Sequence, residues 1–212
     1  MINERKVREP QQKRSIEKKD KILKAGYKLI CKNGYYKTTT SEIAAEAGVS
    51  IGCLYSYFKD KHTIFLDILK KYQAQFDKLR DEFMNKMLLF KSPEECFREF
   101  MLILIDIHDK SVDFQREVKT LYYYDPEVAA LSDEQRKKVQ DAALYSIKLY
   151  KEYIDIDDYE AAAVVASLII NSVVDDVSLY KNSIDRNRIL DEAVKALCRY
   201  LKMKPINHLN KY

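Results

Sequence analysis

Glycine is confined to the first quarter of the chain, and this distribution constrains the fold more than any other feature of the sequence. The four glycines are Gly26, Gly34, Gly48 and Gly52, so the last 160 of the 212 residues contain none. Phosphate-cradling loops and nucleophile elbows need glycine, because they require positive φ or a close approach of the backbone. We therefore expect residues 53–212 to be nearly all helix and to contain neither kind of loop.

Basic residues are concentrated at the N-terminal end. Residues 1–61 contain 14 Lys and Arg against 7 Asp and Glu, a balance of +7, whereas residues 62–212 contain 23 against 26, a balance of −3. Proteins that bind nucleic acids gather positive charge where the phosphates lie. Residues 1–16 contain little that could be buried and are predicted to form a flexible basic arm, which is either a solvated tail or a segment that follows DNA phosphates or enters a minor groove.

Several classes of protein are disfavoured by what the sequence lacks. No apolar run approaches the roughly 20 residues of a membrane span and the N-terminus is charged, so we expect a cytoplasmic protein without a membrane anchor. The four cysteines are scattered without a C-x-x-C pair, which argues against a disulfide framework and a zinc site. With three histidines and no H-E-x-x-H, G-x-S-x-G or G-K-[ST] motif, we expect no enzyme, no cofactor and no metal site. His108, between two aspartates, is interpreted as part of a solvated helix end rather than a ligand.

Residues 17–62 have the pattern of a helix-turn-helix DNA-binding domain. Apolar residues recur at helical spacing over residues 18–30. Thr39 and Glu42 have the spacing of a capping box for a short helix, and Ser50 can cap a second one after a glycine-containing turn. Two short helices joined by a tight turn make a helix-turn-helix.

Residues 63–205 are predicted to form a helical regulatory and dimerisation domain, followed by a tail over 206–212. Apolar residues keep the 3.6-residue period from 60 to 87, which predicts a helix long enough to connect the two domains. Helices predicted around 159–180 and 189–201 are the candidate dimer surface. Periodicity supports packing within one monomer equally well.

One motif between residues 18 and 65 is found in a known family. It consists of Ile22, Ala25, Gly34, Tyr35, Thr38, Thr39, Thr40, Glu42, Ile43, Ala44, Ala47, Gly48, Val49, Ser50, Gly52, Leu54, Tyr55, Tyr57, Phe58 and Lys61. Through this motif, the N-terminal part of the chain resembles the TetR family of repressors. The remainder of the chain resembles the family only in being helical and of suitable length. The resemblance implies an all-α fold with an N-terminal three-helix helix-turn-helix DNA-binding domain and a C-terminal helical ligand-binding and dimerisation domain. It further implies a ligand-responsive repressor that binds a palindromic operator in double-stranded DNA as a homodimer.

The second short helix is too short to read bases with more than its exposed N-terminal residues. We expect Ser50 to donate a hydrogen bond, Ile51 to contact a thymine methyl, and Gly52 to let the backbone come near. The predicted phosphate contacts, which the resemblance also implies, are Thr38, Thr39, Thr40, Tyr55, Tyr57 and Lys61. Each residue has a structural alternative: Tyr55 as core, Thr39 as a cap only, Ile51 as a packing residue.

The chain contains 16 Tyr and 8 Phe, which is a generous supply of side chains for an apolar cavity. The candidate lining of a pocket for a hydrophobic or aromatic small-molecule effector is Phe100, Leu104, Phe114, Tyr122, Tyr123 and Tyr145. Plain core packing is the alternative for each of these residues. If no pocket exists, the chain is an architectural or protein-regulated DNA-binding factor.

Overall fold

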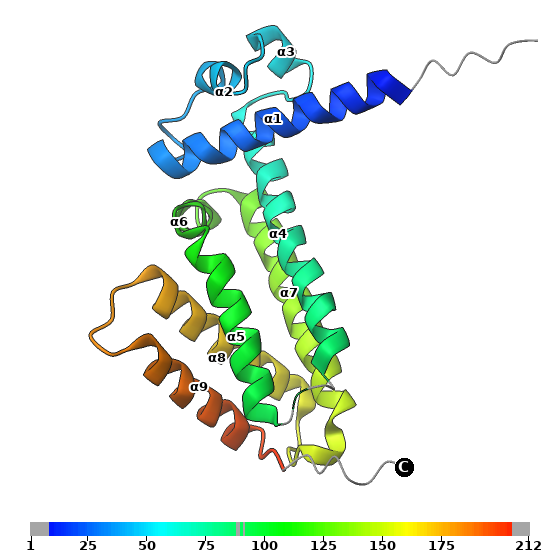
Figure 1. The fold of residues 1–212 in the computed structure, drawn as a ribbon, viewed down its shortest axis with the longest axis vertical. Coiled ribbons are helices and arrows are strands. Elements are labelled where there is room, and N and C mark those ends of the chain that lie inside the picture. Colours follow the sequence, from blue (N-terminus) through cyan, green and yellow to red (C-terminus); the bar gives the residue numbers. More distant parts are fainter. Residues whose placement is uncertain (1–8, 88–89, 91, 205–212) are drawn as a thin grey trace, which may run out of the picture. The chain divides into compact units, whose positions relative to one another are not determined.

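The computed structural model describes residues 9–87, 90 and 92–204, and these residues form helices joined by short connections (Figure 1). The helices are α1 (Glu9–Asn33), α2 (Thr40–Glu46), α3 (Ile51–Tyr55), α4 (Lys61–Lys86), α5 (Pro93–Asp109), α6 (Val112–Tyr122), α7 (Pro126–Leu149), the 3-10 helix η2 (Lys151–Tyr153), α8 (Tyr159–Leu179) and α9 (Arg186–Tyr200). No strand occurs among the described residues, and the predicted all-α fold is confirmed.

The chain folds into two compact units. The first, which we call the head, comprises residues 1–75 and 116–128; the second, the body, comprises residues 76–115 and 129–212. The division at residue 62 predicted from the sequence therefore differs from the observed one, because the first half of α4 and a distant segment of α6 and α7 pack with the head. The body takes up the remaining parts of these same helices.

The N-terminal arm also differs from the sequence expectation. Helix α1 begins at Glu9, inside the segment predicted to be a flexible arm over residues 1–16. Residues 1–8 and the predicted tail over 206–212 lie outside the described residues.

The core of the head forms where α1 crosses close to α4. Gly26 makes this possible: a Cβ atom there would lie 3.1 Å from both Ile64 Cγ2 and Ile68 Cδ1. Ile22 and Phe65 are fully buried in the same region. At about 25 cal/mol per Å² of apolar surface, burying side chains of this size stabilises the unit by roughly 1.5–3 kcal/mol each.

The body is built around α5, α8 and α9, which pack on one another through a shared apolar cluster. Its fully or nearly fully buried members include Met101 of α5, Val174 of α8 and Leu197 of α9. Asp158 and Asp185 accept hydrogen bonds from the backbone N–H groups of the second and third residues of α8 and α9, respectively, and so fix where these helices begin.

Helix α8 corrects one expectation from the sequence, which found no apolar run approaching the length of a membrane span. Residues Tyr159–Leu179 are long and apolar enough to cross a membrane by length and composition. Core helices of soluble proteins pass the same test, and in this structure Ala166, Ile170 and Val174 of α8 are buried against α5 and α9. This packing is that of a central helix.

Candidate nucleic-acid interface

Helices α2 and α3 form the predicted helix-turn-helix, and each is started by its own side-chain cap. The Thr39 hydroxyl accepts from the Glu42 N–H at 3.2 Å, and a Glu42 carboxylate oxygen accepts from the Thr39 N–H at 2.8 Å. Hydrogen bonds from the Thr39 hydroxyl and backbone lower the pKa of Glu42. Ser50 Oγ accepts from the Cys53 N–H at 3.1 Å, which starts α3. Gly48, with φ of +66°, supplies the left-handed residue in the turn between them.

The N-terminus of α3 is exposed on one side and anchored on the other. Leu54 is fully buried and fixes the helix to the head, while Ser50, Ile51 and Gly52 are exposed. A Cβ atom on Gly52 would meet nothing within 4 Å. No contact within the protein therefore requires glycine here, and the exposed backbone is open to a ligand.

Tyr55 faces solvent and links the two helices. Its side chain is 51% exposed, so it is not the core residue that the packing alternative predicted. The Tyr55 hydroxyl lies 3.1 Å from Thr40 Oγ1 at the start of α2. This pair presents two adjacent hydroxyls at the start of α2, where backbone N–H groups favour an anion. Tyr57 is half-buried.

Thr38 departs from its predicted role. The side chain is 1% exposed, and its hydroxyl donates to the Gly34 carbonyl at 2.8 Å. The hydroxyl is therefore occupied within the turn that joins α1 to α2, residues 34–39, which we call the α1–α2 turn. It does not face a DNA phosphate in this conformation, because an inward hydrogen bond holds it.

Lys61, like Thr38, is directed into the α1–α2 turn and does not present an exposed ammonium group. Its ammonium donates to the carbonyls of Tyr35 at 2.6 Å and Thr38 at 2.8 Å, with a longer contact of 3.4 Å to the Tyr36 carbonyl. It also lies 4.4 Å from the centre of the Tyr35 ring. Burial lowers the pKa of Lys61, and the charge of Glu42 opposes this shift. Positioning of the turn, rather than direct contact with phosphate, is what this geometry supports.

A carboxylate far away in the sequence completes the contacts of the α1–α2 turn. Glu117 of α6 accepts a hydrogen bond from the Tyr35 N–H at 2.9 Å, across 82 residues of chain. The Tyr35 ring packs edge-on against Phe65, with ring centroids 5.2 Å apart. Glu117 was not among the predicted site residues, because a single glutamate on an amphipathic helix carries no local sequence signal of a contact 82 residues away.

A second contact joins the start of α4 to the start of α7. His62 Nε2 lies 2.7 Å from Asp125 Oδ2, and His62 Nδ1 lies 3.4 Å from Glu127 Oε2. The other oxygen of Asp125 accepts the N–H groups of Glu127 and Val128, which caps α7. Among the described residues no group of three or more His, Cys, Asp and Glu is arranged to hold a metal ion.

The comparisons with known proteins concentrate on this head. The family of bacterial regulatory proteins of the tetR type matches residues 22–68. The HTH-type transcriptional regulator QacR of Staphylococcus aureus is 47% identical over 64 residues, which cover 28% of this chain and 34% of that protein. Residues 22–68 are therefore similar to the DNA-binding domain of the TetR family.

Similarity to other regulators extends over longer stretches of the chain at lower identity. The fatty acid metabolism regulator protein of Bacillus subtilis is 28% identical over 99 residues, 46% of this chain and 51% of that protein. The matched region thus spans at most about half the length of these two curated relatives. Salmonella enterica GusR superposes with a TM-score of 0.70 at 17% identity, covering 87% of this chain and 95% of that one. The fatty acid degradation regulator FadR of Bacillus halodurans superposes with a TM-score of 0.62 at 18% identity, covering 92% and 97%. These two structures show that the whole fold is shared.

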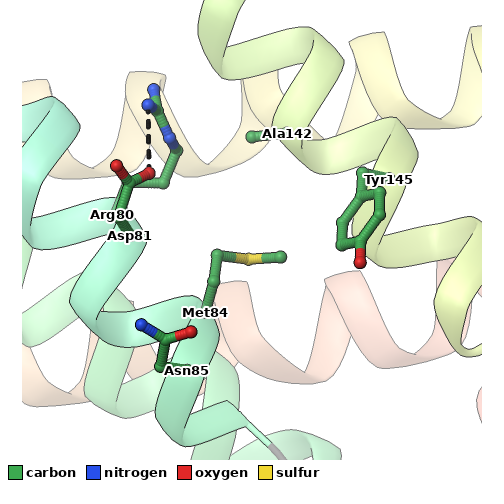
Figure 2. A pocket seen from close by; sticks show the side chains of 6 residues that line it. All are labelled: Arg80, Asp81, Met84, Asn85, Ala142 and Tyr145. Carbon is green, nitrogen blue, oxygen red and sulfur yellow. Dashed lines mark hydrogen bonds and ion pairs between the residues drawn. The ribbon is translucent and has the colours of Figure 1, made fainter.

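The body has an open groove between α4 and α7 (Figure 2). Its volume is about 320 Å³, and it is lined by Arg80, Asp81, Met84, Asn85, Ala142 and Tyr145. Arg80 is paired with Asp77 at 2.9 Å and with Asp81 at 3.3 Å, so its charge is compensated beside the groove. Of the six residues predicted to contact an effector, Tyr145 lines this groove, and its side chain is 61% exposed.

The other predicted effector residues are not gathered around one cavity. Phe100 and Leu104 pack against the apolar cluster of the body, and Phe114 is fully buried. The ring of Phe100 lies tilted against that of Phe83, with centroids 4.8 Å apart, as core packing predicts. Tyr122 and Tyr123 belong to the head, and Tyr123 is 81% exposed, so it does not form the wall of an enclosed pocket in this conformation.

His108 corrects another expectation: it lies in the last turn of α5, but its side chain is only 16% exposed and so is not solvated. Its ring packs edge-on against Phe76, with centroids 5.6 Å apart, and Nδ1 lies 3.4 Å from Asp175 Oδ1. Nδ1 is buried and makes no hydrogen bond of good geometry with a described residue. The helical position faces inward because α5 packs against α8 there.

Proposed function

We propose that the chain is a sequence-specific transcriptional regulator that binds a palindromic operator in double-stranded DNA as a homodimer, and that a small molecule weakens this binding. The observation that carries the proposal is the exposed, separately capped N-terminus of α3 on a TetR-family head. Ser50, Ile51 and Gly52 lie there with no contact in the protein that would require a glycine. An α-helix of this kind enters the major groove with its N-terminal residues toward the base edges. Repression, rather than activation, is what the family resemblance favours.

Helices α8 and α9 supply the dimer surface in this proposal. Val164 and Leu168 of α8 and Tyr200 of α9 are exposed apolar side chains, and Leu168 is 52% exposed. An isologous interface would bury this apolar surface against the same surface of a second copy. Two heads in a dimer read half-sites about 34–36 Å apart, one turn of DNA.

The effector is proposed to be a hydrophobic or aromatic small molecule that binds in the body. Two similar proteins carry names that refer to fatty acid metabolism or degradation, and the apolar side chains around α5 and α8 are of the kind that would contact an acyl chain. The groove of about 320 Å³ lies at the lower end of the volumes of ligand sites. The fully buried Phe114 would have to move to admit a ligand to the interior.

An architectural or protein-regulated DNA-binding factor is the second candidate. The observation that favours it is the open form of the groove between α4 and α7, whose wall includes the exposed Tyr145. A site of this form does not surround a small ligand, whereas a protein partner could cover it.

Selection of bound sequences from random duplex DNA by the purified protein tests the proposal. We expect an enriched palindrome, bound as a dimer, with an affinity that falls steeply with salt because phosphate contacts release counterions. The Ile51→Ala variant should lose preference at the base pair that Ile51 contacts, while the exposed Asp141→Ala serves as a control far along α7. Failure to enrich any sequence would overturn sequence-specific regulation and favour the architectural candidate.

The remaining parts of the proposal concern location and chemistry. A DNA-binding regulator of the TetR family acts in the cytoplasm, and we place this chain there. We propose binding, not turnover, of the effector. Chemical conversion of a bound candidate effector by the pure protein would contradict that part of the proposal.

A further inference from the structure

The α1–α2 turn is held from two directions by side chains that do not belong to the helix-turn-helix. Lys61 of α4 donates to the turn's carbonyl groups. Glu117 of α6 accepts from the Tyr35 N–H at 2.9 Å. One side chain therefore satisfies acceptors and the other satisfies a donor of the same short segment, which restrains both its position and its orientation.

The carboxylate of Glu117 fits closely over the start of the turn. Gly34 has φ of +85°, and a Cβ atom on it would lie 3.4 Å from Glu117 Oε1. A Cβ atom there would make an ordinary van der Waals contact with the carboxylate, so the positive φ, and not a lack of space, favours glycine at this position. A charged acceptor on a backbone N–H makes one of the stronger hydrogen bonds available to a protein.

The segment that carries Glu117 is attached to the head at a second point. Asp125 contacts His62 at 2.7 Å with one oxygen and caps α7 with the other. Residues 116–128 accordingly cluster with the head, although residues 76–115 of the body separate them from its N-terminal part along the chain. The contacts of Asp125 restrain the far end of this segment, and this restraint limits how far Glu117 can move relative to the turn.

We propose that Glu117 is a positioning residue for DNA binding, which holds the α1–α2 turn so that the N-terminus of α2 meets the DNA backbone. The turn ends at Thr39, which caps α2, and Thr40 follows it beside Tyr55. Displacement of the turn would move this cap and the Thr40–Tyr55 hydroxyl pair away from the phosphates. The inference rests on the proposed DNA-binding function and adds to it a residue of α6, outside the family's head motif.

Three variants of the full chain test this role on the operator recovered by selection. Glu117→Ala removes the acceptor, Glu117→Gln keeps an oxygen that can accept the same N–H, and Asp141→Ala removes an exposed carboxylate elsewhere. Loss of a negative charge by itself should strengthen attraction to DNA or leave it unchanged. We expect the opposite for Glu117→Ala, an affinity lower by about 5–30-fold, as loss of one charged hydrogen bond implies. Glu117→Gln should lose less affinity than Glu117→Ala, because its amide oxygen can still accept the same N–H, though more weakly than a carboxylate.

Two further measurements separate positioning from loss of folded protein. If a phosphate contact is lost, the slope of log affinity against log salt becomes shallower by about 0.9, whereas a smaller folded fraction leaves the slope unchanged. Hydrogen exchange at the Tyr35 amide should be faster in Glu117→Ala than in Glu117→Gln, with both variants fully helical by circular dichroism. If Glu117→Ala binds the operator with the wild-type affinity and the wild-type salt slope, the positioning role of Glu117 is refuted, while the proposed DNA-binding function stands. Failure of the wild type to bind any enriched operator would remove the proposed function, and this role with it.

Discussion

Replacement of Gly52 by alanine should make the protein more stable and a weaker DNA binder at the same time. Gly52 lies in α3, and a Cβ atom on it would meet no protein atom within 4 Å. Alanine loses less backbone entropy than glycine in a helix, a gain of roughly 0.5–1 kcal/mol. For a chain of about 200 residues, this gain raises the melting temperature by roughly 1–4 °C.

The same methyl group should obstruct the approach of α3 to the base pairs. If the backbone at Gly52 comes within contact distance of a base edge, the loss is comparable to one wrong base contact, about 1–3 kcal/mol, or roughly 5–150-fold in affinity. Thermal denaturation and titration of the selected operator measure the two effects independently. Unchanged affinity in a stabilised Gly52→Ala variant would refute the close approach of this residue to DNA.

Gly26→Ala is the matched comparison, because it is the same substitution in another helix of the head. Its Cβ atom would lie 3.1 Å from Ile64 Cγ2 and Ile68 Cδ1, where α1 meets α4. Overpacking costs typically about 1–3 kcal/mol, which exceeds the gain in helix propensity. The melting temperature should fall, and a rise would show that α1 and α4 can separate without cost.

Three further substitutions test other parts of the head. Leu54→Ala should lower the stability by about 2–5 kcal/mol, since the side chain is fully buried, and a shift of denaturation below about 1 kcal/mol would contradict its anchoring role. Tyr55→Phe removes the hydroxyl beside Thr40 from an exposed side chain, so DNA affinity should fall while the melting temperature changes little; equal affinity would exclude the hydroxyl as a contact. Hydrogen bonds from Thr39 lower the pKa of Glu42, so its contribution to stability is present above the ordinary pKa and is lost as the pH falls through the lowered one. Denaturation at pH 7 and pH 3 should accordingly differ less for Glu42→Gln than for the wild type, and an equal difference would refute this coupling.

The parts of the head that were predictable are those set by near neighbours in the chain. The capping box at Thr39 and Glu42 and the cap at Ser50 involve residues three apart, and both are observed. Such caps can be recognised from sequence spacing, because the unsatisfied N–H groups at a helix N-terminus are within reach of side chains that are close in the chain. The same reasoning could not assign Thr38, whose hydroxyl turns back to a carbonyl four residues earlier.

Periodicity in the body predicted which faces are buried, but not what space remains between them. Phe100 packs against the apolar cluster and Phe114 is fully buried, which is the packing alternative stated for both residues. A cavity depends on whether facing side chains from different helices leave a void, and that property belongs to the assembled core. Of the six residues that line the groove, only Tyr145 was among the predicted effector contacts.

Lys61 and Glu117 contact the same turn with opposite charges, and this shows why a family motif does not by itself give each residue's role. Lysine at the start of α4 suits a phosphate contact by charge alone, yet its ammonium here is surrounded by the carbonyls of the α1–α2 turn. Glutamate on α6 carries the charge that DNA repels, yet its carboxylate completes the same turn. Net charge therefore measures the attraction of the head for DNA, whereas the alignment of the α2 N-terminus depends on two charges of opposite sign that are directed into the protein.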